Sequence, residues 1–428
     1  MPASEMIPET TAWAVIDPKA YADGTSARDA FAWLRANLPL GKAELEGNFP
    51  FWVVTKHADI LEISRQNDQF RSGDRSTTFT TPEGDARVRQ MTGGSPHLVR
   101  TLVQMDAPDH PHYRLLTQSW FLPQNIRPLE ERIRKIAREH VDRMAELGGE
   151  CDFARDIALT YPLRVIMEVL GVPPEDEPRM LRLTQELFGA ADPELSRSGA
   201  AQGETPDAMA ELQAIIADFF MYFKKITDDR KVAPKSDLAS VIANGQIAGA
   251  PISDFEAMSY YVIVATAGHD TTSSSTAGAI WGLCENPDQF AKLKADPSLI
   301  PGLVDESIRW VTPVKHFMRS ATADYDLRGR TIRAGDWLWL AYPSGNRDEE
   351  VFDEPDAFSI ERNPNRHLAF GYGAHLCLGQ HLAKMEMRIL WEELMPRLQS
   401  LELAGEPKLS AGSFVGGPKR LPIRYKLS

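Results

Sequence analysis

Cysteine is scarce in this chain of 428 residues, which has only Cys151, Cys284 and Cys377. No two of them stand at the C-x-x-C spacing of metal-binding and redox motifs, so we expect neither a zinc site nor a disulfide framework. Such sparse cysteine suits a reducing compartment, and we predict a cytoplasmic protein.

Positive charge and apolar runs are also in deficit. The 47 Lys and Arg face 60 Asp and Glu, which gives a formal net charge of -13. Because affinity for nucleic acid depends on surplus basic residues, we exclude nucleic acid as a partner. Residues 1–21 carry acidic side chains and prolines but no apolar core, so we expect no signal peptide and no membrane anchor.

The pattern of residues along the chain indicates one large domain, residues 1–428. Hydrophobic residues make up 43% and charged residues 25%, which is enough to bury a sizeable core. There is no internal repeat, and the most linker-like stretch, 190–206, is too short to separate domains. Helical spacing covers 125–144, 159–170, 211–226 and 301–310, whereas strands are expected at 49–55, 317–342 and 421–427. The predicted fold class is mainly α with a smaller β-rich region.

A long helix is predicted over residues 253–286. Ser253 and Glu256 form a capping box at its start. Asn286, followed by Pro287, should end this helix and cap the next one.

The middle of this helix breaks its apolar pattern at Gly268, Asp270 and Thr271. A carboxylate and a hydroxyl inside a core helix are typical of a reactive site. Taken alone, the pattern fits equally well a kinked helix in which Ser/Thr back-bonding surrounds a satisfied polar core.

Cys377 lies in the segment FGYGAHLCLG, residues 370–379, just before helical spacing at Leu382 and Met385. A thiol at a helix N-terminus meets the positive end of the helix dipole, which predicts a lowered pKa and a thiolate able to bind iron. The glycines allow a tight turn close to a flat ligand. A lone cysteine is more often buried and inert, so the surrounding motif is what favours the ligand role.

Residues 370–379 resemble the haem-binding signature of the cytochrome P450 family, F-G-x-G-x-H-x-C-x-G, at every fixed place. Three further segments match the family in order and spacing. Glu306 and Arg309 resemble its E-x-x-R element, residues 267–271 its A/G-G-x-D/E-T element, and residues 106–114 the helix that approaches the haem edge. The resemblance is nearest to the soluble bacterial branch that hydroxylates alpha-terpineol, and it implies the cytochrome P450 fold.

The resemblance also implies roles for individual residues. Cys377 would ligate the iron of haem b, since a thiolate ligand favours O–O cleavage. Thr271 would hydrogen-bond dioxygen and Asp270 would relay protons. Glu306 and Arg309 would form a structural ion pair. The two haem propionates would be met by His110, Arg114, Arg319 and His375.

One position departs from the family pattern. Ala357 stands where many relatives carry Arg, so the third partner of Glu306 and Arg309 would be Arg347 or Arg362.

The implied reaction is hydroxylation, in which RH, O2, two electrons and two protons give ROH and water. Ile263, Thr266 and Ala267 share the helix face of Asp270 and Thr271, so they should line the substrate pocket. The resemblance adds Val314, Phe317, Phe414 and Val415. This apolar lining predicts a small monoterpene or alkyl-aromatic hydrocarbon as substrate.

Three alternatives stay open. Lys315, if turned into the pocket, would anchor a carboxylate and make the protein an aromatic-acid hydroxylase, although snorkelling to the surface is favoured. A non-catalytic haem-thiolate sensor would need an output domain, and the sequence shows none. A peroxide-using relative would lack the acid and alcohol that Asp270 and Thr271 supply.

Electrons must come from a separate protein because no G-x-G-x-x-G motif follows a predicted strand. The resemblance implies a ferredoxin with a flavoprotein ferredoxin reductase. Such a donor would dock on a local basic face near the cysteine loop. The candidates for this face are Arg71, Arg362, Arg366, Lys384 and Arg388.

Overall fold

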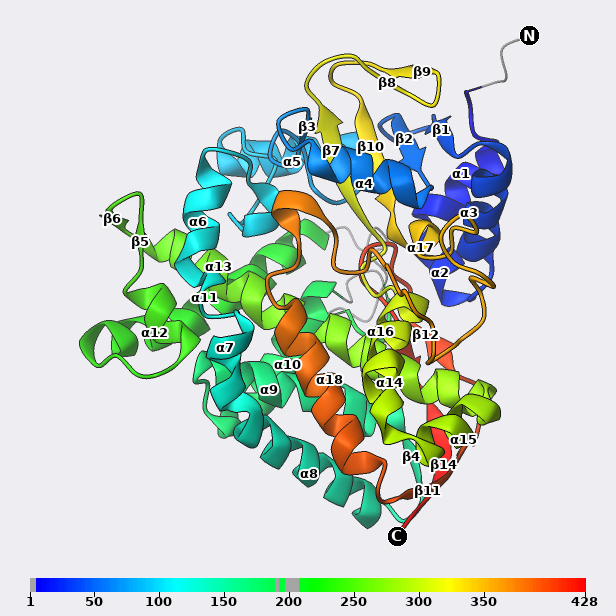
Figure 1. The fold of residues 1–428 in the computed structure, drawn as a ribbon. Coiled ribbons are helices and arrows are strands. Elements are labelled where there is room, and N and C mark those ends of the chain that lie inside the picture. Colours follow the sequence, from blue (N-terminus) through cyan, green and yellow to red (C-terminus); the bar gives the residue numbers. More distant parts are fainter. Residues whose placement is uncertain (1–4, 189–191, 197–207) are drawn as a thin grey trace.

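The computed structural model describes residues 5–188, 192–196 and 208–428, so most of the linker-like stretch 190–206 lies outside the described residues. Figure 1 shows helices forming most of the molecule, with a sheet near its N-terminal side. The expectation of a mainly α fold with a smaller β-rich region is confirmed. Among the described residues, no helix combines the length and the apolar character that a bilayer span requires.

The largest sheet joins strands from residues 40–71 with strands from residues 316–341. Its strands run in the order β1 (Leu40–Ala43), β2 (Phe51–Val54), β10 (Trp337–Ala341), β7 (His316–Ala321) and β3 (Phe70–Arg71). The β2–β10 pair is parallel and the other pairs are antiparallel. Strand β10 is buried along its whole length, as expected of a central strand covered on both faces.

The remaining strands form smaller sheets. The predicted C-terminal strand is confirmed, because β14 (Pro422–Leu427) lies between β11 (Leu398–Leu403) and β4 (Glu150–Asp152). The two-stranded pairs are β5 (Gln246–Ile247) with β6 (Ala250–Pro251), β8 (Tyr325–Leu327) with β9 (Arg330–Ile332), and β12 (Lys408–Leu409) with β13 (Pro418–Arg420).

The helices account for most of the chain. They are α1 (Glu9–Ile16), α2 (Pro18–Ala22), α3 (Ser26–Asn37), α4 (His57–Arg65), α5 (Pro82–Thr92), α6 (Asp109–Gln118), α7 (Pro123–Ile126), α8 (Glu130–Glu146), α9 (Thr160–Leu170), α10 (Glu177–Phe188), α11 (Ala208–Val232), α12 (Leu238–Ala243), α13 (Asp254–Ala267), α14 (Asp270–Glu285), α15 (Pro287–Ala295), α16 (Ile300–Val311), α17 (Tyr342–Gly345) and α18 (Gln380–Leu394). Helices α9, α11 and α16 confirm three of the four predicted amphipathic segments.

The fourth segment, residues 125–144, is also confirmed as helical, but it is divided between α7 and α8. A 3-10 turn, Arg127–Leu129, separates α7 from α8. Pro128 lies in this turn, and a proline inside a helix would remove a hydrogen bond and clash with the preceding turn. The helix therefore begins afresh at Glu130.

The long helix predicted over 253–286 is also divided, into α13 and α14. The capping box of Ser253 and Glu256 is confirmed, and α14 ends at Glu285 as expected. Asn286 does not cap the next helix through its side chain, which instead donates to the Gly282 carbonyl at 2.8 Å.

The break itself lies at Gly268 and His269, where the backbone leaves the helical path. A Cβ on Gly268 would lie 2.9 Å from Ile166 of α9, so the close approach of the two helices requires glycine. Thr271 Oγ1 donates to the Ala267 carbonyl at 2.9 Å across the break. The back-bonding that bends helices is therefore present.

Candidate active site

The loop before α18 presents Cys377 to the interior. The Cys377 N–H donates to the Phe370 carbonyl at 2.9 Å, which closes the loop. Gly371 and Gly373 have φ values of 68° and 74°, a region that favours glycine. A Cβ on Gly373 would lie 2.1 Å from the Ser64 carbonyl oxygen of α4. This glycine thus allows the loop to contact another helix.

Burial dominates the electrostatics of Cys377 and raises the pKa of its thiol. The N–H groups of Gly379 and Gln380 and the charge of Arg114 act in the opposite direction but do not outweigh burial. For the free thiol this direction is opposite to the predicted lowering, because burial outweighs the helix N-terminus, and the role of Cys377 as iron ligand stays a prediction. A metal ion bound to the sulfur would supply the missing positive charge.

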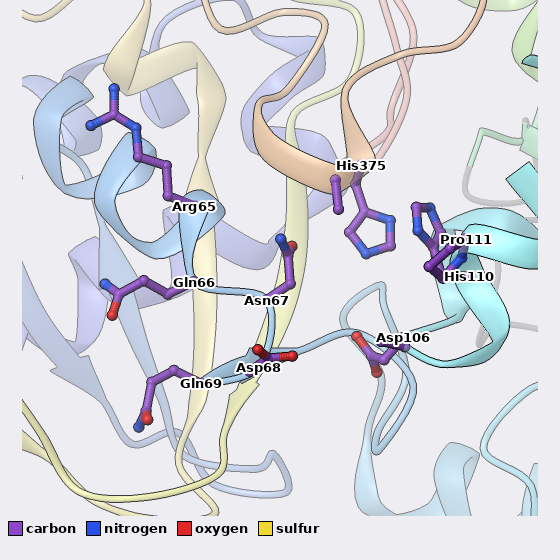
Figure 2. A pocket seen from close by; sticks show the side chains of 11 residues that line it. Arg65, Gln66, Asn67, Asp68, Gln69, Asp106, His110, Pro111 and His375 are labelled. Carbon is purple, nitrogen blue, oxygen red and sulfur yellow. The ribbon is translucent and has the colours of Figure 1, made fainter.

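Four basic or donor side chains converge beside this loop. The His110 and His375 rings lie 4.4 Å apart between centroids, and Figure 2 shows them next to each other at one side of the pocket. The charges of Arg319, His110 and Arg114 act together with burial to lower the pKa of His375. The structure thus brings the predicted propionate-binding residues together.

These side chains lack an anionic partner. Within the described residues none of the four forms an ion pair, and His110 Nε2 is buried with no hydrogen-bond partner. Arg319 is 5% exposed and donates to the carbonyl of its own neighbour Met318. Arg114 donates to the Leu376 carbonyl at 2.9 Å. A cluster of basic and donor side chains beside a half-buried cysteine fits a dianionic, iron-bearing group such as haem.

A pocket of about 510 Å³ opens beside this cluster (Figure 2). Among the residues that line the pocket, Asp106 has a buried carboxylate. This carboxylate accepts hydrogen bonds from the N–H groups of Ser72 and Gly73. The lining residues are Arg65, Gln66, Asn67, Asp68, Gln69, Asp106, Ala107, His110, Pro111, Ala374 and His375.

Asp270, at the start of α14, is not a satisfied core residue. Its Oδ2 is buried without a partner, and burial raises the pKa of the carboxyl. It lines a polar cavity of about 600 Å³ together with Ser273 and Ser274. The helix is therefore kinked by back-bonding and also carries an unsatisfied acid, so the satisfied-core interpretation does not hold.

The predicted substrate-lining residues fall into two groups. From the C-terminal part of the chain, Val314 and Val415 form a β-bridge, and the Phe317 and Phe414 rings lie 5.5 Å apart. On α13, Ile263 is half-buried and Ala267 is exposed.

Thr266 departs from the prediction that it lines the pocket. It is 1% exposed and donates to the Val262 carbonyl at 2.7 Å. A helical residue one position away from the open face turns into the packed interior, so its hydroxyl is not available to a substrate.

Lys315 is half-buried, and in the part of the chain that the structure describes it forms no ion pair with a carboxylate. Its ammonium donates to the carbonyls of Val311 and Thr312, at 3.0 and 2.8 Å, at the C-terminus of α16. Such a cation caps orphan carbonyls and meets the negative end of the helix dipole. Burial lowers the pKa of Lys315 to about 7. The prediction that it snorkels outward is thus wrong, because nearby carbonyls satisfy it.

The Glu306–Arg309 ion pair is confirmed as a buried contact of 2.7 Å. Its third partner is Arg362, whose Nε lies 3.2 Å from Glu306, whereas Arg347 pairs with Asp356. The structure thereby decides between the two candidates.

The same contact removes Arg362 from the predicted docking face, because its side chain is only 9% exposed. Arg71, Lys384 and Arg388 are each engaged by acidic neighbours. Arg366 is exposed. The five residues therefore do not form one uncommitted basic patch.

Sequence reasoning missed several contributors to the site. Ser72 lies 3.2 Å from His375, and His269 contacts Asp270. Buried His316 bridges the N–H of Phe79 and the carbonyl of Ser413. Only His269 carried a signal, since it lies inside the glycine-acid-alcohol break; the others depend on contacts between distant segments.

Comparison with known proteins agrees with this geometry. Residues 81–411 match the family model described as Cytochrome P450, so the chain belongs to the cytochrome P450 family. It is 51% identical over 425 residues to Cytochrome P450-terp of a Pseudomonas species, with 99% of both chains covered. Linalool 8-monooxygenase of Pseudomonas putida is 30% identical, covering 92% of this chain and 94% of that protein.

Solved structures give the same result. The crystal structure of CYP108D1 from Novosphingobium aromaticivorans superposes with a TM-score of 0.91 at 47% identity, covering 99% of this chain and 100% of that one. The cytochrome P450 fold is thus confirmed, and the chain is a cytochrome P450 monooxygenase. Membership of this family implies a haem cofactor, dioxygen and a redox partner.

Proposed function

We propose that this monooxygenase hydroxylates a small apolar molecule, a monoterpene or an alkyl-aromatic hydrocarbon, with haem b as cofactor. The observation that carries the proposal is the convergence of the Cys377 loop with four basic side chains that have no anionic partner. Bound haem would supply the activation of dioxygen and the oxidation of the C–H bond. Cys377 would hold the iron, and His110, Arg114, Arg319 and His375 would hold the propionates.

The residues at the helix break would manage protons. Asp270 borders the polar cavity and retains an unpartnered oxygen, so it is placed to exchange protons with water. Thr271 would direct these protons to the reacting centre through its hydroxyl. The alternative of a sensor without catalysis is disfavoured because the relatives include named monooxygenases.

Support for an apolar substrate comes from the wall of the pocket. The Val314–Val415 and Phe317–Phe414 contacts place apolar side chains together. Linalool 8-monooxygenase is named for a terpene alcohol, and it resembles this chain over nearly its full length. Lys315 is engaged with backbone carbonyls, which disfavours the aromatic-acid alternative.

For electrons we propose a ferredoxin served by a flavoprotein ferredoxin reductase.

The three cysteines form no disulfide, which is in keeping with a cytoplasmic location.

The experiment is a ligand screen on the purified haem-loaded protein. Monoterpenes and alkylbenzenes should drive a low-to-high-spin change in the haem spectrum, whereas the matched aromatic carboxylates should not. Products formed with a surrogate ferredoxin and reductase would then identify the hydroxylated carbon. Tight binding of aromatic acids, with the hydrocarbons leaving the spectrum unmoved, would overturn the proposed substrate class.

A further inference from the structure

His269, at the break between α13 and α14, has no part in the function proposed above, yet it is fully buried and contacts three elements. Its Nε2 lies 2.7 Å from the carbonyl oxygen of Leu159, next to α9. Its Nδ1 lies 2.9 Å from Thr184 Oγ1 of α10 and 3.6 Å from Asp270 Oδ1. The ring thus connects the neighbouring helices to the acid at the break.

The partners of His269 allow two protonation states. Because a carbonyl only accepts, Nε2 carries a hydrogen in both states. Thr184 has one hydroxyl hydrogen and two acceptors in reach, His269 Nδ1 at 2.9 Å and the Leu181 carbonyl at 3.0 Å. If the hydroxyl donates to Nδ1, the ring is neutral. If it donates to Leu181, its oxygen accepts from Nδ1–H and the ring is an imidazolium.

These two states differ only by rotation of one hydroxyl group, and in both of them every ring nitrogen is hydrogen-bonded. A buried imidazolium normally requires a nearby anion. Asp270 is that anion, since its Oδ1 faces Nδ1. The charged residues Arg155 and Asp156 lie farther out, in the wall of the polar cavity that Asp270 borders.

The two oxygens of Asp270 face different surroundings. Oδ1 lies beside His269, whereas Oδ2 is unpartnered and the residue lines the cavity. One proton can therefore reside on Asp270 beside a neutral ring, or on the ring beside an ionised Asp270, without any change in the total charge.

His140 provides a comparison within the same molecule. Its ring is also buried between a backbone carbonyl, that of Ile136 at 2.8 Å, and a threonine hydroxyl, that of Thr160 at 3.1 Å. No carboxylate pairs with it in the described part of the chain. Burial, with the charges of Arg164 and Arg143, lowers the pKa of His140 to about 4, so its ring stays neutral. Asp270 is what distinguishes the environment of His269.

We propose that His269, together with Thr184, is a positioning residue that stores a proton for Asp270. The proton moves from Nδ1 to Oδ1 as the Thr184 hydroxyl turns from Leu181 to Nδ1, and the ring becomes neutral. The 3.6 Å gap must close, as catalytic contacts do when a reacting complex forms. Water in the cavity restores the lost proton through Oδ2. Each turnover consumes two protons, and the pair holds one of them on the ring while Asp270 is ionised.

This inference rests on the proposed function, in which Asp270 supplies protons. The test uses the haem-loaded enzyme and the compound that gives the largest spin change in the screen. His269→Gln keeps an amide able to donate to Leu159 but cannot hold a proton. Thr184→Val removes the rotating hydroxyl, whereas Thr184→Ser restores it. His140→Gln is the matched control.

We expect His269→Gln and Thr184→Val to retain substrate binding while the fraction of electrons lost to peroxide rises severalfold. The solvent isotope effect on product formation, measured in H2O and D2O, should rise with it. Thr184→Ser and His140→Gln should match the wild type in both measurements. These readouts report proton supply and do not follow from a loss of packing alone.

Two results would overturn the inference: wild-type coupling and isotope effect in His269→Gln, or an equal peroxide leak in His140→Gln. Asp270→Asn separates this failure from that of the proposed function. If Asp270→Asn slows product formation or uncouples the enzyme and His269→Gln does neither, only the stored proton is refuted. If neither variant changes the rate of product formation or the coupling, the proton role of Asp270 is refuted as well.

Discussion

At Cys377 the competition between burial and nearby positive charge decides the state of the sulfur. Burial raises the pKa of the thiol more than the α18 N-terminus and Arg114 lower it. The surrounding basic groups form no ion pair in the part of the chain that the structure describes, and His110 Nε2 has no hydrogen-bond partner. The Cys377 sulfur therefore lacks a cation and the basic side chains lack anions. An iron ion in a group with two carboxylates would supply both.

Replacing Cys377 tests this argument directly. We expect Cys377→Ser and Cys377→His to abolish the red-shifted carbon-monoxide band that a thiolate-ligated ferrous haem gives. Cys151→Ser and Cys284→Ser should retain the full band, because neither residue lies in the glycine-containing loop 370–379 that precedes α18. Retention of the band in Cys377→Ser would assign the ligand to another residue.

Asp270 and Thr271 carry the second prediction at this scale. Thr271→Ala should bind substrate and take up electrons normally but divert reducing equivalents to peroxide, because the proton is misdirected. Asp270→Asn should slow product formation by about 100-fold, the lower end of general acid–base effects. Oxygen, peroxide and product should be counted together. Wild-type turnover with unchanged peroxide in both variants contradicts the relay.

Among the elements, the C-terminus of α16 is contacted by the side chain of Lys315. Lys315 donates to the last carbonyls of α16, and its own N–H donates to the Phe414 carbonyl at 2.7 Å. The helix end and the C-terminal turn are therefore tied to one residue. The adjacent Val314–Val415 bridge joins the same two segments of the chain, which fixes part of the proposed pocket wall.

This cap predicts a pH-dependent stability. The pKa of Lys315 is about 7 in the folded protein and 10.5 in the unfolded chain. Between these values the unfolded state binds more protons, so this residue makes the folded state more stable as the pH rises. The melting temperature of Lys315→Met, relative to wild type, should therefore improve as the pH falls from about 9 to about 6. A difference independent of pH would show that the ammonium is not buried.

Local patterns predicted these elements better than contacts between them. The capping box at Ser253 and the motif around Cys377 are short-range features, and both could be predicted from the sequence. The break at Gly268 could be located from the local pattern, whereas its close approach to Ile166 of α9 is a contact that no local pattern reveals. Arg362 was a candidate for two roles, and only its burial against Glu306 decides between them.

Over the whole molecule, the strands interleave segments that are distant in sequence. Strand β2, near the N-terminus, pairs with β10, and β4 from the middle of the chain pairs with the C-terminal β14. Any cut between residues 54 and 422 separates the partners of at least one of these pairs. The site is likewise assembled from α6, β7 and the loop before α18.

This interleaving supports the prediction that residues 1–428 form one domain. We expect the haem-loaded protein to unfold in one cooperative transition, with calorimetry, far-ultraviolet circular dichroism and haem absorbance giving the same midpoint. The physical reason is that separating either paired segment exposes strand edges and the core beneath them, so partial unfolding loses contacts on both sides. Saturating substrate should raise the midpoint of all three signals together, because a ligand that binds only the folded state stabilises the whole unit. Two separated calorimetric transitions, or a proteolytic fragment that keeps its own cooperative melt, would show that the chain contains independent domains.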